Sequence, residues 1–209
     1  MDGMRLQWLV FFPGRPSSND WKRIDAASRI VRAALSHESP IHLVFDDKTS
    51  VSFEPSFLGA WNGKEDHYVT LVQSIVKGDA CAGAVHRPRT MRLDDCLFAF
   101  RPILRDVDAV LDFSEHGTMA FGTFPTMTAT KSALCVIGGV KDILLREHEV
   151  LRGMCEELRK PQLSISLGCK PELTSKCIKA GGKRNLFRCR PLPGVTLRFM
   201  HSKRFASEM

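Results

Sequence analysis

The apolar positions in the first quarter of the chain alternate between continuous runs and helical spacing. Residues 6–12 form an almost unbroken apolar run, typical of a buried strand, which Pro13-Gly14 ends. Apolar residues three and four apart then predict a helix over about residues 19–36. Two apolar segments, 41–45 and 51–53, flank a polar turn and predict a hairpin. The first 53 residues are therefore predicted to have the order β-α-β-β, which indicates a sheet with a helix on one face.

Patterns in the rest of the chain are more uneven. An amphipathic stripe stopped by Gly78 predicts a helix over residues 65–77, and residues 140–158 show the strongest helical spacing in the protein. The remaining expectations are a loop over 78–92, a short strand over 97–100, a short helix over 103–113, strands over 119–124, 133–137 and 163–167, little periodicity over 168–182, and a small hairpin from 186 to 199.

These elements predict an α+β fold with a mixed or antiparallel sheet and about three main helices. We expect a globular body over residues 1–160, because the composition changes after Lys160-Pro161. Residues 161–209 are then a basic C-terminal region, either a short hairpin or a partly disordered tail.

Composition limits the class of protein. Of 209 residues, 44% are hydrophobic, enough for a real core. No apolar run reaches the roughly 18 residues of a transmembrane helix, and the apolar start lacks the features of a secretion signal. Seven cysteines, an odd number, favour reduced thiols. We therefore expect a cytoplasmic or nuclear protein that is not secreted.

Charge is divided unevenly between the two regions. Residues 159–209 hold 12 Lys and Arg against 2 acidic residues, whereas residues 1–158 hold 18 against 21. A local excess of cations attracts polyanions, because Lys and Arg release counterions from phosphates, and Phe rings between them can stack on unpaired bases. An anionic membrane surface or a merely solvated face are the alternatives. The candidate nucleic-acid-binding residues are Lys176, Lys179, Lys183, Arg184, Phe187, Arg188, Arg190, Arg198, Lys203 and Arg204.

A zinc site is an open question for the same region. Cys169, Cys177, Cys189 and His201 would form a Cys3His ligand set, which suits tetrahedral zinc. Their intervals of 8, 12 and 12 residues contain no close ligand pair of the kind that zinc modules use. No metal ligand is therefore predicted.

One stretch resembles the Nudix box of nucleoside-diphosphate hydrolases. When the first Gly of the motif is set on Gly138, its Arg falls on Arg152 and its metal-binding pair on Glu156 and Glu157. Three motif positions are replaced, by Leu144, Gly153 and Arg159. The resemblance implies a phosphohydrolase that uses Mg²⁺, in a degenerate form.

The function expected from the sequence is a non-enzymatic nucleic-acid-binding protein, with RNA as the favoured partner and further protein partners open. The many Phe and few Tyr residues hint at a compact viral genome, so we expect a viral accessory or regulatory protein that interacts with its host. The alternatives are a matrix-like assembly protein with an anionic membrane or nucleoprotein partner, and a degenerate Nudix-like phosphohydrolase. No catalytic residue and no cofactor is predicted, and the oligomeric state stays open.

Overall fold

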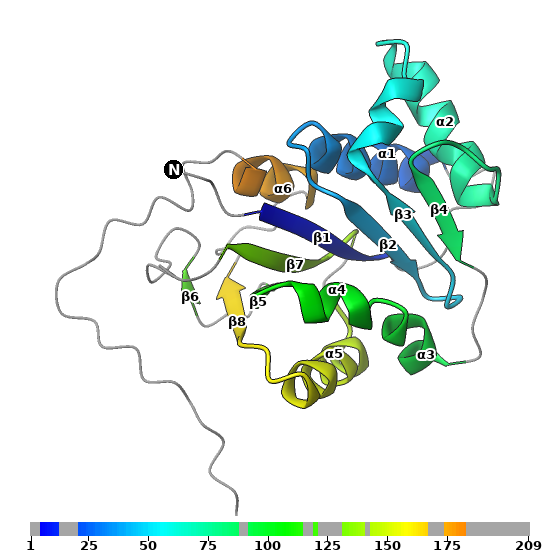
Figure 1. Cartoon of the computed structure of the whole chain (residues 1–209). Helices are drawn as coiled ribbons and strands as arrows, with labels where there is room; N and C mark the ends of the chain where they lie inside the picture. Colours follow the sequence, from blue (N-terminus) through cyan, green and yellow to red (C-terminus); the bar gives the residue numbers. More distant parts are fainter. Residues whose placement is uncertain are drawn as a thin grey trace, which may run out of the picture.

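A single sheet with helices on both faces forms the centre of the protein (Figure 1). The computed structural model describes residues 5–12, 21–87, 92–114, 119–120, 131–140, 143–166 and 174–182. Within them the strand order is β4-β3-β2-β1-β7-β5-β8-β6. The strands are β1 (Arg5–Phe12), β2 (Ile41–Phe45), β3 (Ser50–Phe53), β4 (Ala84–Arg87), β5 (Ala109–Ser114), β6 (Met119–Ala120), β7 (Ser132–Gly138) and β8 (Gln162–Ser166).

Most of the sheet is parallel. The pairs β1–β2, β1–β7, β5–β7, β5–β8 and β6–β8 are parallel, and only β2–β3 and β3–β4, at one side, are antiparallel. Parallel neighbours need crossover connections, which place helices on the faces of the sheet and bury both of them. This requirement explains why every residue of β2, β5 and β7 is buried.

The helices form two layers (Figure 1). One core cluster lies between the sheet and α1, α2 and α6, with Trp8, Phe45 and Ile178 among its buried side chains. A second cluster lies between the opposite face and α3, α4 and α5. The helices are α1 (Trp21–Leu35), the 3-10 helix η1 (Pro55–Ala60), α2 (Glu65–Lys77), α3 (Leu93–Phe98), α4 (Arg101–Asp106), α5 (Leu145–Glu157) and α6 (Thr174–Gly182).

Local patterns account for the best-defined helix. Glu65 and Asp66 lie in the first turn of α2 and Lys77 in its last, where each sign of charge favours the helix dipole. The helix ends at Gly78, which adopts a left-handed conformation with φ 115°. The predicted bounds of this helix are confirmed.

The predicted fold class is wrong. The protein is an α/β structure with a mostly parallel sheet, and the described residues contain six α-helices and one 3-10 helix instead of about three. Two segments were predicted with the wrong secondary structure. Residues 97–113 form parts of α3, α4 and β5 instead of a strand followed by a helix, and β4 lies in a predicted loop. The hairpin expected from 186 to 199 lies outside the described residues.

The sheet and the helix layer continue beyond residue 160. β8 pairs with β5, and α6 packs on α1. The predicted division of the chain near residue 160 therefore does not coincide with an end of the sheet, and as a domain boundary it stays a prediction. None of the described helices has the length and apolar character needed to cross a lipid bilayer.

Two glycines with positive φ offer a test of the packing around β3 and β4. A Cβ at Gly83 (φ 79°) would lie 2.4 Å from the backbone nitrogen of Phe57, whereas at Gly63 (φ 87°) it would meet nothing within 4 Å. We expect Gly63→Ala to lower the free energy of unfolding by about 1 kcal/mol, from backbone strain alone. Gly83→Ala adds a backbone clash and should cost about 3 kcal/mol. If urea unfolding shows that both variants lose the same free energy of unfolding, the close packing of Gly83 on Phe57 is contradicted.

Candidate functional site

Polar side chains collect on the α5 side of β5 and β8. Side chains alternate between the two faces of a strand, so Leu111 and Phe113 of β5 join the core cluster under α1 while Asp112 faces α5. Gln162 and Ser164 of β8 share that side, and Ser164 lies directly beside Asp112 in the parallel register. A polar floor is unusual in a sheet covered on both faces, and it marks this region as a candidate site.

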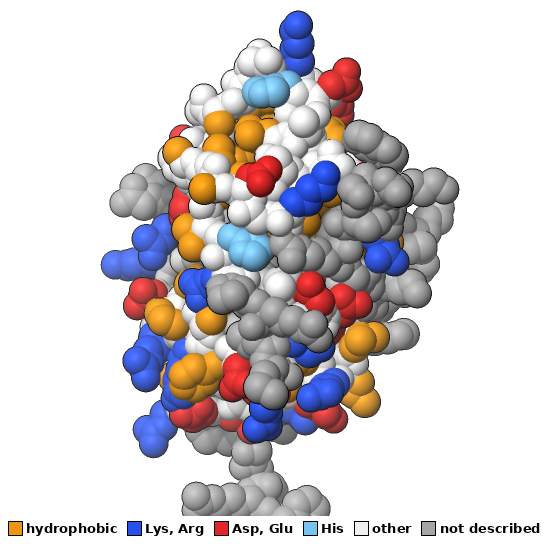
Figure 2. Space-filling view, turned by 90° about the vertical axis from the view of Figure 1, so that its right-hand side faces the viewer, with side chains coloured by type: hydrophobic (Ala, Val, Ile, Leu, Met, Phe, Trp, Pro, Cys, Tyr) orange, Lys and Arg blue, Asp and Glu red, His pale blue; other side chains and the backbone are white. Residues whose placement is uncertain are grey.

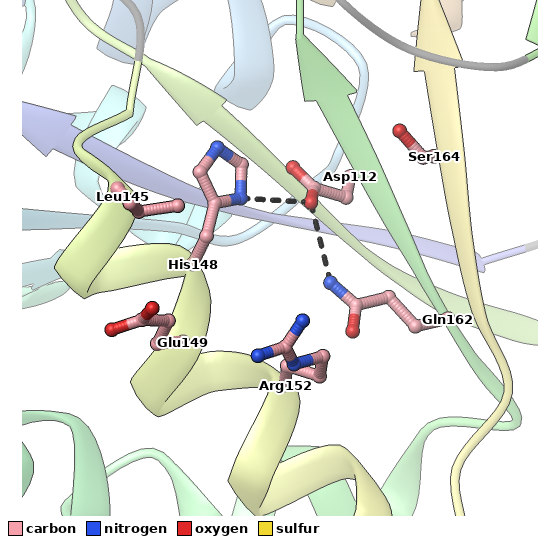
Figure 3. A pocket seen from close by; sticks show the side chains of 7 residues that line it. All are labelled: Asp112, Leu145, His148, Glu149, Arg152, Gln162 and Ser164. Atoms are coloured by element: carbon pink, nitrogen blue, oxygen red, sulfur yellow. Dashed lines mark hydrogen bonds and ion pairs between the residues drawn. The ribbon is translucent and has the colours of Figure 1, made fainter. Parts of the chain in front are cut away.

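A hydrogen-bonded triplet joins three elements at this floor (Figure 3). The Asp112 carboxylate accepts a hydrogen bond from Nδ1 of His148 at 3.0 Å and another from the Gln162 amide nitrogen at 3.2 Å. The Asp112 side chain is only 7% exposed, against 25% for His148. Because an ionised carboxylate can only accept, the His148 proton resides on Nδ1, and Nε2 is an acceptor in the neutral ring. Asp112 thereby sets both the orientation and the tautomer of His148.

Around this triplet lies a pocket of about 300 Å³. Arg152 and Glu149 stand at its exposed rim on α5, and Leu145 provides an apolar wall. Figure 3 shows the Arg152 side chain extending over the space in front of Gln162. We call this site the α5 pocket; it is lined by Asp112, Leu145, His148, Glu149, Arg152, Gln162 and Ser164.

The first turn of α5 holds His148 in place. The Glu147 carboxylate accepts a hydrogen bond from the Leu144 amide at 2.9 Å, which satisfies one of the amide groups left open at a helix start. Burial raises the pKa of Glu147, and that hydrogen bond opposes the rise. Further along the helix, Leu151 and Cys155 are buried in the core cluster under α5. The pocket wall is therefore anchored at the helix start and through its apolar face.

A second region of interest is the edge of the sheet where the parallel strands end. The connection after β1 runs through α1 to β2, whereas the connection after β7 runs through α5 to β8, on the opposite face and in the opposite direction. β1 and β7 are neighbours, so the winding of the sheet reverses between them. Open α/β sheets bind ligands outside the carboxyl ends of the strands at such a switch point.

The described residues at this edge are packed closely. A Cβ at Gly139 would lie 2.4 Å from the Phe12 ring, so glycine is required where β7 ends beside β1. The buried hydroxyl of Thr174, the first residue of α6, lies 2.5 Å from the carbonyl oxygen of Gly138 and 2.9 Å from that of Gly139. We call this group (Phe12, Gly138, Gly139 and Thr174) the carboxyl edge.

Two of the predicted nucleic-acid-binding residues lie on α6. Lys176 and Lys179 are exposed and lie in the first two turns of α6. Because α6 begins at Thr174, both lysines are close in sequence to the carboxyl edge. On the face shown in Figure 2, Lys and Arg are interspersed with Asp and Glu, unlike the cation-rich C-terminal sequence. The other predicted residues lie outside the described ones: Lys183, Arg184, Phe187, Arg188, Arg190, Arg198, Lys203 and Arg204.

Neither of the two metal arrangements considered from the sequence is formed by the part of the chain that the structure describes. Cys177 is buried in the core under α1, while Cys169, Cys189 and His201 lie outside the described residues. Of the Nudix-like residues, Glu157 pairs with Arg101 and Arg152 lines the α5 pocket. Among the described residues, no three His, Cys, Asp or Glu side chains are grouped so that they could hold a metal ion.

The sequence analysis missed Asp112, His148 and Gln162. One signal was present: a carboxylate in the apolar run from Val110 to Phe113. That run was assigned to a helix, in which a lone Asp faces solvent without consequence. As a strand between two parallel neighbours it buries the Asp, which then needs partners.

Comparison with known proteins shows the fold. No protein-family model matches the chain, and no curated protein sequence matches it. Among solved structures, Nep1 of Archaeoglobus fulgidus bound to S-adenosylhomocysteine has a TM-score of 0.54 at 11% identity, covering 88% of this chain and 97% of that one. The SpoU methyltransferase AviRb of Streptomyces viridochromogenes, in complex with AdoMet, covers 88% of this chain and 57% of that one at 16% identity; its TM-score of 0.43 is too low to establish a shared fold.

The Nep1 likeness overturns the functional prediction. The sequence predicts a non-enzymatic nucleic-acid-binding protein, with a matrix-like assembly protein or a Nudix-like hydrolase as alternatives, and the likeness to Nep1 supports none of these three classes. The shared fold is that of a protein bound to S-adenosylhomocysteine. The predicted viral origin and host interaction are also wrong by this comparison, because the fold is shared with a protein of Archaeoglobus fulgidus and nothing in the likeness supports a virus.

The hydroxyl of Thr174 provides a test of the carboxyl edge. Thr174→Val leaves the carbonyls of Gly138 and Gly139 without this buried donor, and we expect the free energy of unfolding to fall by about 1–3 kcal/mol. The matched control is Thr70→Val in α2, where an exposed hydroxyl bonds to Asp66 and the change should stay within about 0.5 kcal/mol. Equal effects of the two substitutions in denaturant unfolding would show that the Thr174 contact is unimportant.

Proposed function

We propose that this protein is a methyltransferase that uses S-adenosylmethionine. The observation that carries the proposal is the fold shared with Nep1 bound to S-adenosylhomocysteine, over nearly the whole of both chains. S-adenosylhomocysteine is what remains of S-adenosylmethionine after its methyl group has been transferred. An enzyme of this class needs a cofactor site and a neighbouring place for the methyl acceptor.

The carboxyl edge is the proposed cofactor site. Its position at the switch point between β1 and β7 is where an open α/β sheet binds ligands. The residues there fit the group, because Gly138 and Gly139 present backbone without side chains at the end of β7, and Gly139 lets the Phe12 ring pack against that end. Thr174 holds that end of the strand against α6. When bound, the cofactor supplies an electrophilic methyl group on a sulfonium sulfur.

The α5 pocket lies close enough to serve the same reaction. Asp112 is two residues before the end of β5, a distance of about 7 Å along a strand. Asp112 also pairs with Val136 of β7, two residues before Gly138, and His148 is hydrogen-bonded to Asp112. The two sites therefore lie near the same carboxyl end of the central strands, the carboxyl edge on the α6 side of the sheet and the α5 pocket on the α5 side.

RNA is the proposed substrate class. The excess of 12 Lys and Arg over 2 acidic residues in residues 159–209 supports a polyanionic substrate. The exposed side chains of Lys176 and Lys179 follow Thr174 on α6, next to the proposed cofactor site. In this proposal both lysines contact phosphates, and the eight further candidate residues from Lys183 to Arg204 extend the contact.

Calorimetric titration tests the cofactor site. We expect the full chain to bind S-adenosylmethionine and S-adenosylhomocysteine, and Gly139→Ala to weaken both by at least about tenfold, because the new Cβ displaces the Phe12 ring and the end of β7. Gly153→Ala is the matched control, since a Cβ there meets nothing within 4 Å. Circular dichroism checks that each variant is folded. Absence of binding to the unmodified chain would refute the proposal.

Salt-dependent RNA binding tests the substrate class. The double variant Lys176→Gln/Lys179→Gln should bind single-stranded RNA more weakly, and the slope of log affinity against log salt should decrease in magnitude by about 2 because two phosphate contacts are lost. The control is Lys64→Gln/Lys77→Gln, two exposed lysines at the ends of α2. If the two double variants weaken RNA binding equally, the proposed contact of α6 with RNA phosphates is contradicted.

A further inference from the structure

We propose that the α5 pocket is a recognition site for an unpaired guanine of the substrate, distinct from the proposed cofactor site at the carboxyl edge. The inference rests on the proposed function for the presence of a nucleic acid. The choice of base comes from the hydrogen-bonding groups that the pocket leaves open.

Those open groups are mostly acceptors. The Asp112 carboxylate takes the Nδ1 proton of His148 and the amide nitrogen of Gln162. The amide oxygen of Gln162 then remains as an acceptor, and so does Nε2 of His148 in the neutral form of the ring. The Glu149 carboxylate at the rim adds a third acceptor, and it forms no ion pair with any residue that the structure describes. A ligand for this pocket must therefore offer several N–H donors.

Arg152 supplies the complementary donors. Its guanidinium makes no ion pair within the described part of the chain, and it lies over the pocket in Figure 3. Arginine binds a neighbouring pair of acceptors with two parallel hydrogen bonds, as it does at O6 and N7 of guanine. Guanine alone among the four RNA bases places this acceptor pair beside two adjacent N–H groups, N1–H and the 2-amino group.

Charge and size favour a base over a phosphate. The carboxylates of Asp112 and Glu149 at least balance the possible cations Arg152 and His148, so the pocket has no excess of positive charge to attract an anion. The volume of about 300 Å³ lies at the lower end of the range of ligand pockets and suits a single base or nucleoside. Leu145, a residue that is 75% exposed, offers an apolar surface against which the face of a ring can pack.

Nucleoside titrations followed by NMR test the proposal without the cofactor. The side-chain signals of His148 and Arg152 report binding of guanosine, inosine, N1-methylguanosine and adenosine to the full chain. Guanosine should bind about tenfold more tightly than the other three, because inosine lacks the 2-amino group, N1-methylguanosine lacks N1–H and adenosine lacks the O6 acceptor. Equal affinity for all four nucleosides would overturn the proposal.

Variants connect the preference to the pocket. Arg152→Gln and His148→Gln should each remove the preference for guanosine, whereas Arg146→Gln, an exposed arginine on the same helix outside the pocket, should retain it. A preference that persists in both pocket variants would overturn the assignment. Failure of guanosine to bind, with S-adenosylhomocysteine binding intact, would refute this inference alone. Guanosine binding without binding of S-adenosylhomocysteine would instead refute the proposed function.

Discussion

The arrangement of this protein depends on the packing of β7 at the centre of a parallel sheet. All seven residues of β7 are buried, and the strand pairs with β1 on one side and with β5 on the other. Such a strand must be apolar on both faces, because helices cover both. Its end is equally constrained: Gly139 fits against Phe12 only because it has no side chain, and Thr174 fixes α6 to the same point.

Both candidate sites follow from that central position. The chain leaves β7 toward one face of the sheet, whereas it leaves β1 toward the other, so the carboxyl edge lies where the helix layers diverge. The crossover after β7 places α5 over β5 and β8, and His148 then lies above Asp112. Asp112 is tolerated in a buried strand because His148 and Gln162 satisfy its carboxylate.

Fold and charge contribute different parts of the functional proposal. The fold shared with Nep1 covers 88% of this chain, and the proposed cofactor site at the carboxyl edge rests on it. It says nothing about the substrate at 11% identity. The proposed RNA substrate rests on the cation excess after residue 158, and the proposed base site rests on the α5 pocket, whose lining has no excess of positive charge. In that proposal the lysines contact phosphates while the α5 pocket contacts a base, so that backbone contacts and base recognition are separate.

Local sequence determined the elements whose signals are local. The amphipathic pattern over residues 65–77 and the glycine at Gly78 define α2, and the polar turn at Asp46-Asp47-Lys48 defines the β2–β3 hairpin. The excess of Lys and Arg after residue 158 is also evident from the sequence alone. The tertiary structure alone decided the rest. α3 and α4 have six residues each, too few for a clear helical period, and α6 is stabilised by burying Cys177 and Ile178 near α1. The parallel strand order and the contact of Asp112 with His148, 36 residues away, arise from crossovers. Such long-range pairings depend on which faces must be buried together, which no local pattern encodes.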